Sequence, residues 1–397
     1  MGIILKILFL STWFPYPPDN GSKIRVFNLI RQLQAVHQVT FLAVTPEKVD
    51  RARQVELAKY CGRVHTTVAP IYGKTNWRAW LGLVSSLPRA LYATNSASAN
   101  QIVRRLAPES DLVVLSELGT LPYVFSIAKR LAILDDPEFG IIHSRINNAR
   151  SLVACARHSL TWRKSCRFLQ RAMRQVAACT VVSDQERNFF RQAVPSYQRV
   201  YVIPNCLDLK GYADDYGTPQ PDTLIFSGAL TYHANLEAVL WFLQEVWHIV
   251  LDAVPSAHLV LTGELAVDQK QELSHYPNVE CRGYLRDVRP VIATSWLGLA
   301  PLRTGGGTRF KILEALALGT PVVSTTKGAE GLAVTSEQNI LIADHPHQFA
   351  DQVVRLLRSP SLRDALALNG KQLVGEKYDW NQAGAQFRDL IAEVTRV

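Results

Sequence analysis

A short segment between residues 301 and 332 has the residue types and spacing of an anion-binding loop. Its three consecutive glycines, Gly305, Gly306 and Gly307, lack side chains, so backbone amides can approach a ligand closely. We expect Thr308 to cap the helix that follows. Free N–H groups and the positive end of the helix dipole would then face the loop, an arrangement that attracts phosphate.

Charged side chains flank this loop. Arg303 precedes the glycines, and Arg309 and Lys311 follow them, so three cations are available for two adjacent phosphates. Glu314 lies less than two helical turns beyond Thr308, where its carboxylate can accept hydrogen bonds from sugar hydroxyls. Taken singly, these residues also fit a flexible turn, an exposed Lys311–Glu314 ion pair and a solvated arginine. Their combination favours the phosphate site, although the loop is neither a Walker A nor a GxGxxG motif.

The elements that would position the loop follow an alternating pattern of apolar strands and amphipathic helices. We predict strands at residues 6–11, 37–44, 64–69, 111–116, 131–135, 179–183 and 200–203, then at 223–227, 258–261, 279–282, 296–300, 321–324 and 340–343. Helices are predicted in the second series at residues 235–251, 287–293, 308–318 and 346–357. Such alternation predicts parallel sheets with helices on both faces and ligands beyond the carboxyl ends of the strands.

A stretch rich in glycine, proline and aspartate, residues 210–222, interrupts the pattern and predicts a linker. We expect an N-terminal domain over residues 1–208, a linker over 209–222 and a second domain over 223–378. A last helix over 379–397 is expected to pack back on the first domain.

The composition is that of an ordinary packed protein. The chain has 397 residues, is 48% hydrophobic and carries a net charge of +9, which excludes disordered and fibrous classes. Its six cysteines form no CxxC pair and no zinc-like Cys/His spacing, so we expect reduced thiols, no bound metal and a cytoplasmic location. No apolar segment reaches the roughly 20 residues that cross a bilayer.

Basic residues are concentrated between residues 139 and 183, a stretch without any acidic residue. An exposed basic helix face explains this pattern, and so does a helix that binds an anionic membrane surface or a phosphorylated acceptor. Residues 77–92 are a second membrane-facing candidate because Trp77 and Trp80 stand beside basic residues, although a helix packed on the core explains them equally. We find no nucleic-acid recognition motif.

The chain resembles the family 4 retaining glycosyltransferases, which have the GT-B fold. The similarity runs through FLSTWFPYPPDNGSKIRVFNLIRQL near the N-terminus, VVSDQE at 181–186, VIPNCLD at 202–208, FSGALTYHAN at 226–235, VECRGYLRDV at 279–288 and, above all, PLRTGGGTRFKILEALALGTPVVST. It is most similar to a bacterial subgroup that assembles polysaccharides or glycolipids. The resemblance implies an α/β protein of two Rossmann-like domains, whose parallel sheets face a central cleft.

The resemblance also implies which positions bind the donor. Those near the transferred sugar and the diphosphate would be Asn20, Gly21, Ser22 and Gly228, and Ser22 is also the expected cap of the first helix. The diphosphate would be held by the glycine loop with Arg303, Thr308, Arg309 and Lys311. Glu314 would bind the ribose, and Tyr284 and Leu285 would line the base, mainly through their backbone.

Three departures from the family pattern affect the sugar site. Family members commonly have two glutamates eight positions apart, and here Gly306 stands where the first would be, with Glu314 as the second. The arginine and lysine often found at the start of the second domain are absent, so Arg303 and Lys311 are expected to replace them as catalytic cations. The cleft histidine of the first domain has no clear counterpart. We expect Asp136 or Glu138 to contact the sugar or the incoming hydroxyl, with His143 nearby in sequence and a helix cap as the simpler explanation.

The expected function is therefore retaining, metal-independent transfer of a sugar from a nucleotide diphosphate donor, without a cofactor. Its acceptor would be a lipid-linked, saccharide or small-molecule hydroxyl in cell-surface polysaccharide or glycolipid synthesis, and the location cytoplasmic or at the inner face of the membrane. Two alternatives stay open. One is a sugar-nucleotide epimerase, and the other is a non-catalytic partner that retains the nucleotide site.

Overall fold

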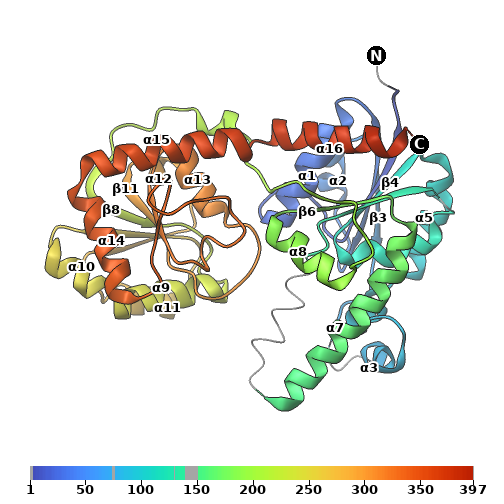
Figure 1. Cartoon of the computed structure of the whole chain (residues 1–397), viewed down its shortest axis with the longest axis horizontal. Coiled ribbons are helices and arrows are strands. Elements are labelled where there is room, and N and C mark those ends of the chain that lie inside the picture. Colours follow the sequence, from blue (N-terminus) through green and yellow to red (C-terminus); the bar gives the residue numbers. More distant parts are fainter. Residues whose placement is uncertain (1–2, 74–76, 129, 139–150, 397) are drawn as a thin grey trace. The chain divides into compact units, whose positions relative to one another are not determined.

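The computed structural model describes residues 3–73, 77–128, 130–138 and 151–396. The chain divides into two compact units (Figure 1). The first consists of Met1–Asn205 together with Asn381–Val397, and the second of Cys206–Trp380. Each unit is built on one parallel sheet, as the alternating sequence pattern predicts.

A seven-stranded sheet of order β3-β2-β1-β4-β5-β6-β7 forms the first unit. Its strands are β1 (Lys6–Ser11), β2 (Gln38–Thr45), β3 (Arg63–Val68), β4 (Leu112–Ser116), β5 (Leu131–Asp135), β6 (Ala178–Val181) and β7 (Val200–Val202). The central strands β1 and β4 are apolar almost throughout because helices cover both faces of the sheet. Strand order reverses between β1 and β4, and sheets of this kind bind ligands at such a point.

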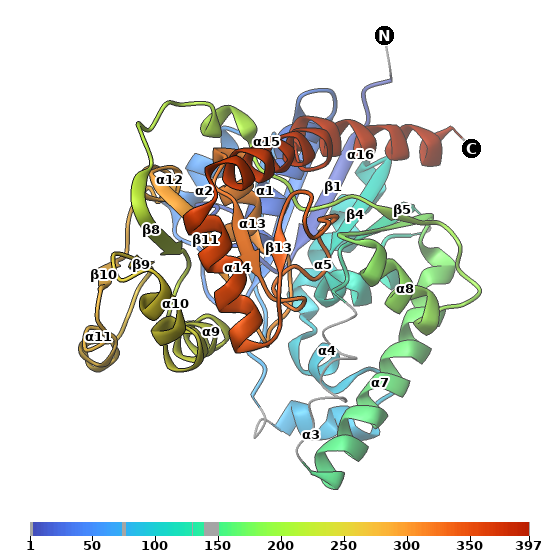
Figure 2. The same ribbon diagram turned by 60° about the vertical axis from the view of Figure 1, so that its left-hand side comes forward.

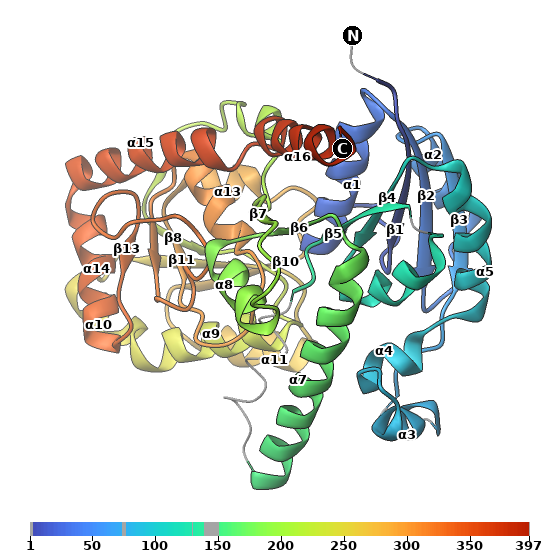
Figure 3. The ribbon, with the colours of Figure 1, turned by 45° about the vertical axis from the view of Figure 1, so that its right-hand side comes forward.

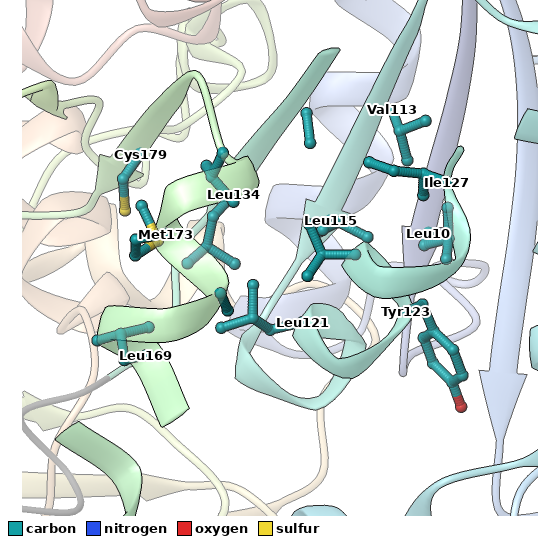
Figure 4. Close-up of a cluster of buried hydrophobic side chains, with 14 of the residues drawn as sticks. Leu10, Val113, Leu115, Leu121, Tyr123, Ile127, Leu134, Leu169, Met173 and Cys179 are labelled. Carbon is teal, nitrogen blue, oxygen red and sulfur yellow. The ribbon is translucent and has the colours of Figure 1, made fainter. Parts of the chain in front are cut away.

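Eight helices of the described residues surround this sheet. They are α1 (Gly21–Gln34), α2 (Arg51–Ala58), α3 (Trp77–Val84), α4 (Arg89–Thr94), α5 (Ala97–Leu106), α7 (Leu152–Ala172), α8 (Asp184–Ala193) and α16 (Trp380–Thr395). On one face, side chains of β1, β4 and β5 meet those of α7 and of the 3-10 segment η2 (Leu118–Ser126) in a continuous apolar core (Figure 4).

The last helix, α16, packs within the first unit although it ends the chain. Arg388 donates a hydrogen bond to Gln32 of α1, and Tyr201 of β7 donates one of 3.0 Å to Glu393. α16 and α1 lie side by side in two views (Figures 1 and 3). The first unit is therefore completed by residues that are distant in sequence.

The second unit is built on a six-stranded sheet of order β10-β9-β8-β11-β12-β13. Its strands are β8 (Gln220–Phe226), β9 (His258–Thr262), β10 (Val279–Gly283), β11 (Ser295–Ala300), β12 (Val322–Ser324) and β13 (Leu341–Ile342). Its helices are α9 (His233–Glu245), α10 (Trp247–Ala253), α11 (Val267–Leu273), α12 (Arg289–Ala293), α13 (Phe310–Leu318), α14 (Pro346–Arg358) and α15 (Pro360–Lys377). α14 packs along β11 and β12 (Figure 2).

The two main differences from the predicted boundaries of this unit concern one helix and one strand. The helix expected over residues 235–251 is two helices, broken at the fully buried Val246, whose backbone leaves helical geometry. Strand β8 begins at Gln220, inside the expected linker, because the Gln220 amide bonds to Thr294 at 2.8 Å and extends the sheet. The expected linker also contains the short 3-10 turn η4 (Leu209–Tyr212), which precedes β8 in the chain.

Candidate functional site

The glycine loop lies directly beyond the carboxyl end of β11, one strand from the loop that follows β8. Gly305 and Gly307 have φ angles of +88° and +84°, in the left-handed region that glycine adopts without strain. Helix α13 begins at Phe310, with Arg309 in the cap position and no hydrogen bond from its side chain to a helix amide. The prediction that Thr308 caps this helix is therefore wrong, because the chain turns into the helix one residue later.

The side chain of Arg309 bonds to the backbone of the glycine loop. Its guanidinium donates hydrogen bonds to the carbonyls of Gly306 and Gly307 and, at 3.2 Å, to that of Gly305. The residue is only 7% exposed, and burial lowers the pKa of the guanidinium. The Arg309 side chain thus satisfies the hydrogen-bonding capacity of the loop carbonyls and fixes their orientation.

Lys311 lies in the first turn of α13 and points toward the loop after β8. Its Nζ donates a 3.0 Å hydrogen bond to Asn235 and lies 3.7 Å from the centre of the Phe226 ring. A Cβ built on Gly228, which has a φ of +137°, would lie 3.1 Å from the same Nζ. Burial and the charge of Arg309 lower the pKa of Lys311 to about 7. The Lys311 amino group therefore lies beside a bare glycine backbone, and its neutral form can take up a proton when an anion binds.

Glu314 lies on the same face of α13 but has a different partner from Lys311. Its carboxylate accepts a 3.1 Å hydrogen bond from the hydroxyl of Tyr212, in η4. Burial raises the pKa of Glu314. The simpler reading of Lys311 and Glu314 as an exposed ion pair does not fit, because both are partly buried and each is bonded elsewhere.

Arg303 is the most accessible of the loop cations, since 53% of its side chain is exposed. It lies 4.0 Å from a carboxylate oxygen of Glu237 and 5.6 Å from the ring centre of Trp241. Tyr284 and Leu285 follow β10 on the same edge of the sheet, and Tyr284 is 76% exposed. All the predicted donor positions of this unit therefore lie beyond carboxyl strand ends or in the helix that follows.

The predicted donor loop of the first unit begins helix α1. Asn20 is the cap residue, and its side chain accepts a 3.1 Å hydrogen bond from the amide of Lys23. The prediction that Ser22 caps this helix is wrong, because Gly21 and Ser22 are already the first two helical residues. Asn20 is exposed, and Gly21 and Ser22 are partly exposed.

Acidic residues gather at the carboxyl end of β5. Asp135 forms a buried ion pair with Arg25 at 2.6 Å. Asp136 is 7% exposed, and its Oδ1 has no hydrogen-bond partner among the described residues. Burial raises the pKa of Asp136 well above its usual value, and burial with the nearby Glu186 raises that of Glu138. His143 lies outside the described residues.

One acidic residue of this edge, Glu117, was missed by the sequence reasoning. It follows β4 with a φ of +63° and accepts hydrogen bonds from the amide and hydroxyl of Thr12, both at 2.9 Å, and from Ser11 and Ser116. Burial raises its pKa to about 7. Its one sequence signal was an acid placed directly after a buried strand, as Asp136 is.

Residues 221–359 match a family model described as Glycosyl transferases group 1. The matched segment contains the loop after β8, the glycine loop and α13. The chain is a nucleotide-sugar-dependent glycosyltransferase.

Relatives of this glycosyltransferase are distant. It is 21% identical over 394 residues, 94% of this chain and 96% of the other, to the "Uncharacterized 44.6 kDa protein in cps region" of Klebsiella pneumoniae. It is 24% identical over 163 residues to a GDP-mannose-dependent monoacylated alpha-(1-6)-phosphatidylinositol monomannoside mannosyltransferase of Corynebacterium glutamicum, covering 37% of this chain and 42% of that enzyme.

Solved structures resemble the glycosyltransferase over nearly its whole length. Anabaena HepE in complex with UDP and glucose aligns with a TM-score of 0.64 at 15% identity, covering 98% of this chain and all of that one. At this identity the likeness establishes the fold alone, which is GT-B. Among the described residues, no helix is long and apolar enough to span a bilayer, and no group of three or more potential metal ligands occurs.

Proposed function

We propose that this glycosyltransferase is a family 4 retaining enzyme, which transfers a sugar from a nucleotide diphosphate donor to a hydroxyl acceptor. The observation that carries the proposal is the position of Lys311, whose Nζ faces the backbone of Gly228 at the first turn of α13. The site combines a helix N-terminus, bare glycine amides and a lysine with a lowered pKa. A dianionic diphosphate interacts favourably with all three.

The reaction follows from where charge develops. As the bond between the anomeric carbon and the diphosphate oxygen breaks, negative charge accumulates on the leaving diphosphate. Lys311 and Arg303 supply positive charge there, the role that a divalent cation has in other enzymes, and stabilise the transition state more than the bound donor. In the proposed retaining course, the leaving phosphate takes the proton of the acceptor hydroxyl on the same face of the sugar.

Around the donor, Glu314 would hold the ribose, and Tyr284 and Leu285 would line the base. Glu314 must then exchange its bond with Tyr212 for a ribose hydroxyl. Arg309 would act through the loop that it holds, as well as by its charge. Asn20, Gly21, Ser22, Asp136 and Glu138 are proposed to contact the sugar and the acceptor hydroxyl.

The acceptor is proposed to be lipid-linked or a saccharide, in cell-surface polysaccharide or glycolipid synthesis. Two similarities support this class: the Klebsiella pneumoniae relative is described as lying in a cps region, and the Corynebacterium glutamicum relative as a phosphatidylinositol mannoside mannosyltransferase. A lipid-linked acceptor would place the enzyme in the cytoplasm, at the inner face of the membrane.

A screen of nucleotide diphosphates and nucleotide sugars by thermal shift tests the donor part of this proposal, because a ligand that binds the folded state raises the melting temperature. We expect a nucleotide diphosphate to stabilise the wild type and to stabilise the K311A variant much less. An equal shift in both proteins would contradict the proposed site.

Transfer itself needs a direct test, because Gly306 stands where a family carboxylate is missing. Incubating the protein with the stabilising nucleotide sugar and a mixture of glycolipid acceptors should give transfer to an acceptor. Binding of the nucleotide sugar without transfer, or conversion of the donor sugar without an acceptor, would contradict the proposed reaction.

A further inference from the structure

Helix α3 presents an apolar stripe to solvent. Trp77, Trp80, Leu81 and Val84 are 67%, 61%, 43% and 87% exposed, and their spacing places them on one face of the helix. Gly82 lies on a different face, where a Cβ would come within 2.9 Å of the backbone of Arg89 in α4. α3 is thus attached to the unit by its glycine face, and its tryptophan face points away.

The segments of the chain that contain α3 and α7 carry basic residues but no acidic ones. Residues 57–108, which include α3, contain no aspartate or glutamate, and neither do residues 139–183, which include α7. These two acid-free segments are brought together in the fold. Lys164 of α7 donates hydrogen bonds to the carbonyls of Gly82 and Ser85, at 3.3 and 3.0 Å, and so ties α7 to the end of α3. The two helices lie beside each other in two views (Figures 1 and 2).

Helix α7 adds cations to this surface. Arg163 and Arg167 are exposed, and their spacing of four residues places them on one side of the helix. Arg89 lies over the ring of Trp80, with 5.8 Å between the guanidinium carbon and the ring centre. An apolar stripe next to cations, with no carboxylate in either segment, is complementary to an anionic lipid surface, whose interface also accommodates tryptophan.

We propose that α3 and α7 form a membrane-docking face, in which the α3 stripe enters the bilayer interface and the α7 arginines contact anionic headgroups. α3 follows the carboxyl end of β3, the sheet edge that also holds Glu117 and Asp136. Docking would therefore bring the acceptor edge of the first unit to the lipid surface. Only this link to a lipid-linked acceptor rests on the proposed function.

The test is co-sedimentation of the full chain with phosphatidylcholine vesicles, with and without phosphatidylglycerol. We expect binding to the anionic vesicles that weakens with salt. The W77Q/W80Q variant is expected to bind at least about tenfold more weakly, since two interfacial aromatic side chains are lost. L368Q, which changes an apolar residue 69% exposed on α15, is the matched control and is expected to bind as the wild type does.

Charge is tested separately. R163Q/R167Q should lose most of the preference for anionic vesicles, whereas R191Q/R286Q, with the same change of charge at exposed positions outside α3 and α7, should keep it. Unchanged binding by W77Q/W80Q or by R163Q/R167Q would overturn the proposal. A shift from dimer to monomer in W77Q/W80Q would also overturn the proposal, because the α3 stripe would then pair two copies of the chain. Binding of RNA without binding of vesicles would overturn it as well.

A thermal shift with uridine diphosphate on the same variants keeps the two proposals apart. W77Q/W80Q and R163Q/R167Q should respond to the nucleotide as the wild type does. The glycine loop, Arg309 and Lys311 lie in the other unit, and the donor positions of the first unit, 20–22, lie outside α3 and α7. Loss of vesicle binding with an intact nucleotide response therefore supports the docking face. Intact vesicle binding in a protein that binds no nucleotide diphosphate would instead contradict the proposed function alone.

Discussion

Lys311 and Asn235 join the first turns of α13 and α9 through a 3.0 Å hydrogen bond between Nζ and Oδ1. The bond holds the lysine where burial lowers its pKa to about 7. At neutral pH only a fraction of the Lys311 side chains is therefore protonated, and that fraction rises when a ligand supplies a negative charge.

Binding of a nucleotide diphosphate should take up a proton. With a pKa near 7, about nine-tenths of Lys311 side chains are neutral at pH 8, and an adjacent phosphate returns them to the charged form. Calorimetric titrations at pH 8 in buffers of different ionisation enthalpy should show uptake approaching one proton. Affinity should stay level below pH 7 and fall as pH rises above it. K311M should show neither effect, and uptake in that variant would assign the proton to another group.

Loss of either loop cation should slow transfer. We expect K311A and R303A each to reduce kcat by roughly 100-fold or more, the scale of removing one fixed group that stabilises developing charge. K371A, at an exposed lysine of α15, is the matched control. Steady-state assays with the identified donor provide the measurement, and near-normal kcat in both variants would remove these residues from the mechanism.

Variants of Arg309 distinguish the role of its positive charge from its role in holding the shape of the glycine loop. Its guanidinium bonds to three loop carbonyls, a pattern that a lysine cannot reproduce although it keeps the charge. If the loop's shape is what matters, R309K should bind the donor about as poorly as R309A, by tenfold or more. Isothermal titration of both variants checks this. Donor binding by R309K at the wild-type level would show that the positive charge alone suffices.

Glu117 should make stability depend on pH. Its pKa is about 7 in the folded chain against 4.5 when unfolded, so the folded state holds more protons between these values. Its contribution to stability is therefore largest below pH 4.5 and is lost as pH rises to 7. Urea unfolding at pH 5 and 7.5 should show a fall in the wild type that is smaller in E117Q. Parallel changes in the two proteins would assign the dependence to other groups.

The fold could be predicted because parallel strands buried on both faces are nearly continuous apolar runs. β1 and β5 occur at the predicted residues. Boundaries were less certain where long-range contacts decide them. Gln220 is held in β8 by a bond to Thr294, which is remote in sequence, and the break in the predicted helix falls at the buried Val246.

The candidate site was predictable where its chemistry is local in sequence. The glycine loop, Arg303, Lys311 and Glu314 occupy one short segment, and the structure adds the partners Asn235 and Tyr212 from elsewhere in the chain. Capping was harder to predict, since Thr308 and Ser22 are good capping residue types but the cap positions fall on Arg309 and Asn20. Glu117 escaped notice because its bonds to Ser11 and Thr12 join residues more than 100 positions apart.

The packing of α16 has a consequence for dissecting the molecule. A fragment that stops at Asn205 lacks the helix that bonds to Gln32 and Tyr201, so an excised N-terminal half would be left with an uncovered apolar flank. Truncation at residue 380 would damage that same half while leaving the second unit intact. An autonomous version of the first unit therefore needs residues 381–397 grafted back by a designed connection.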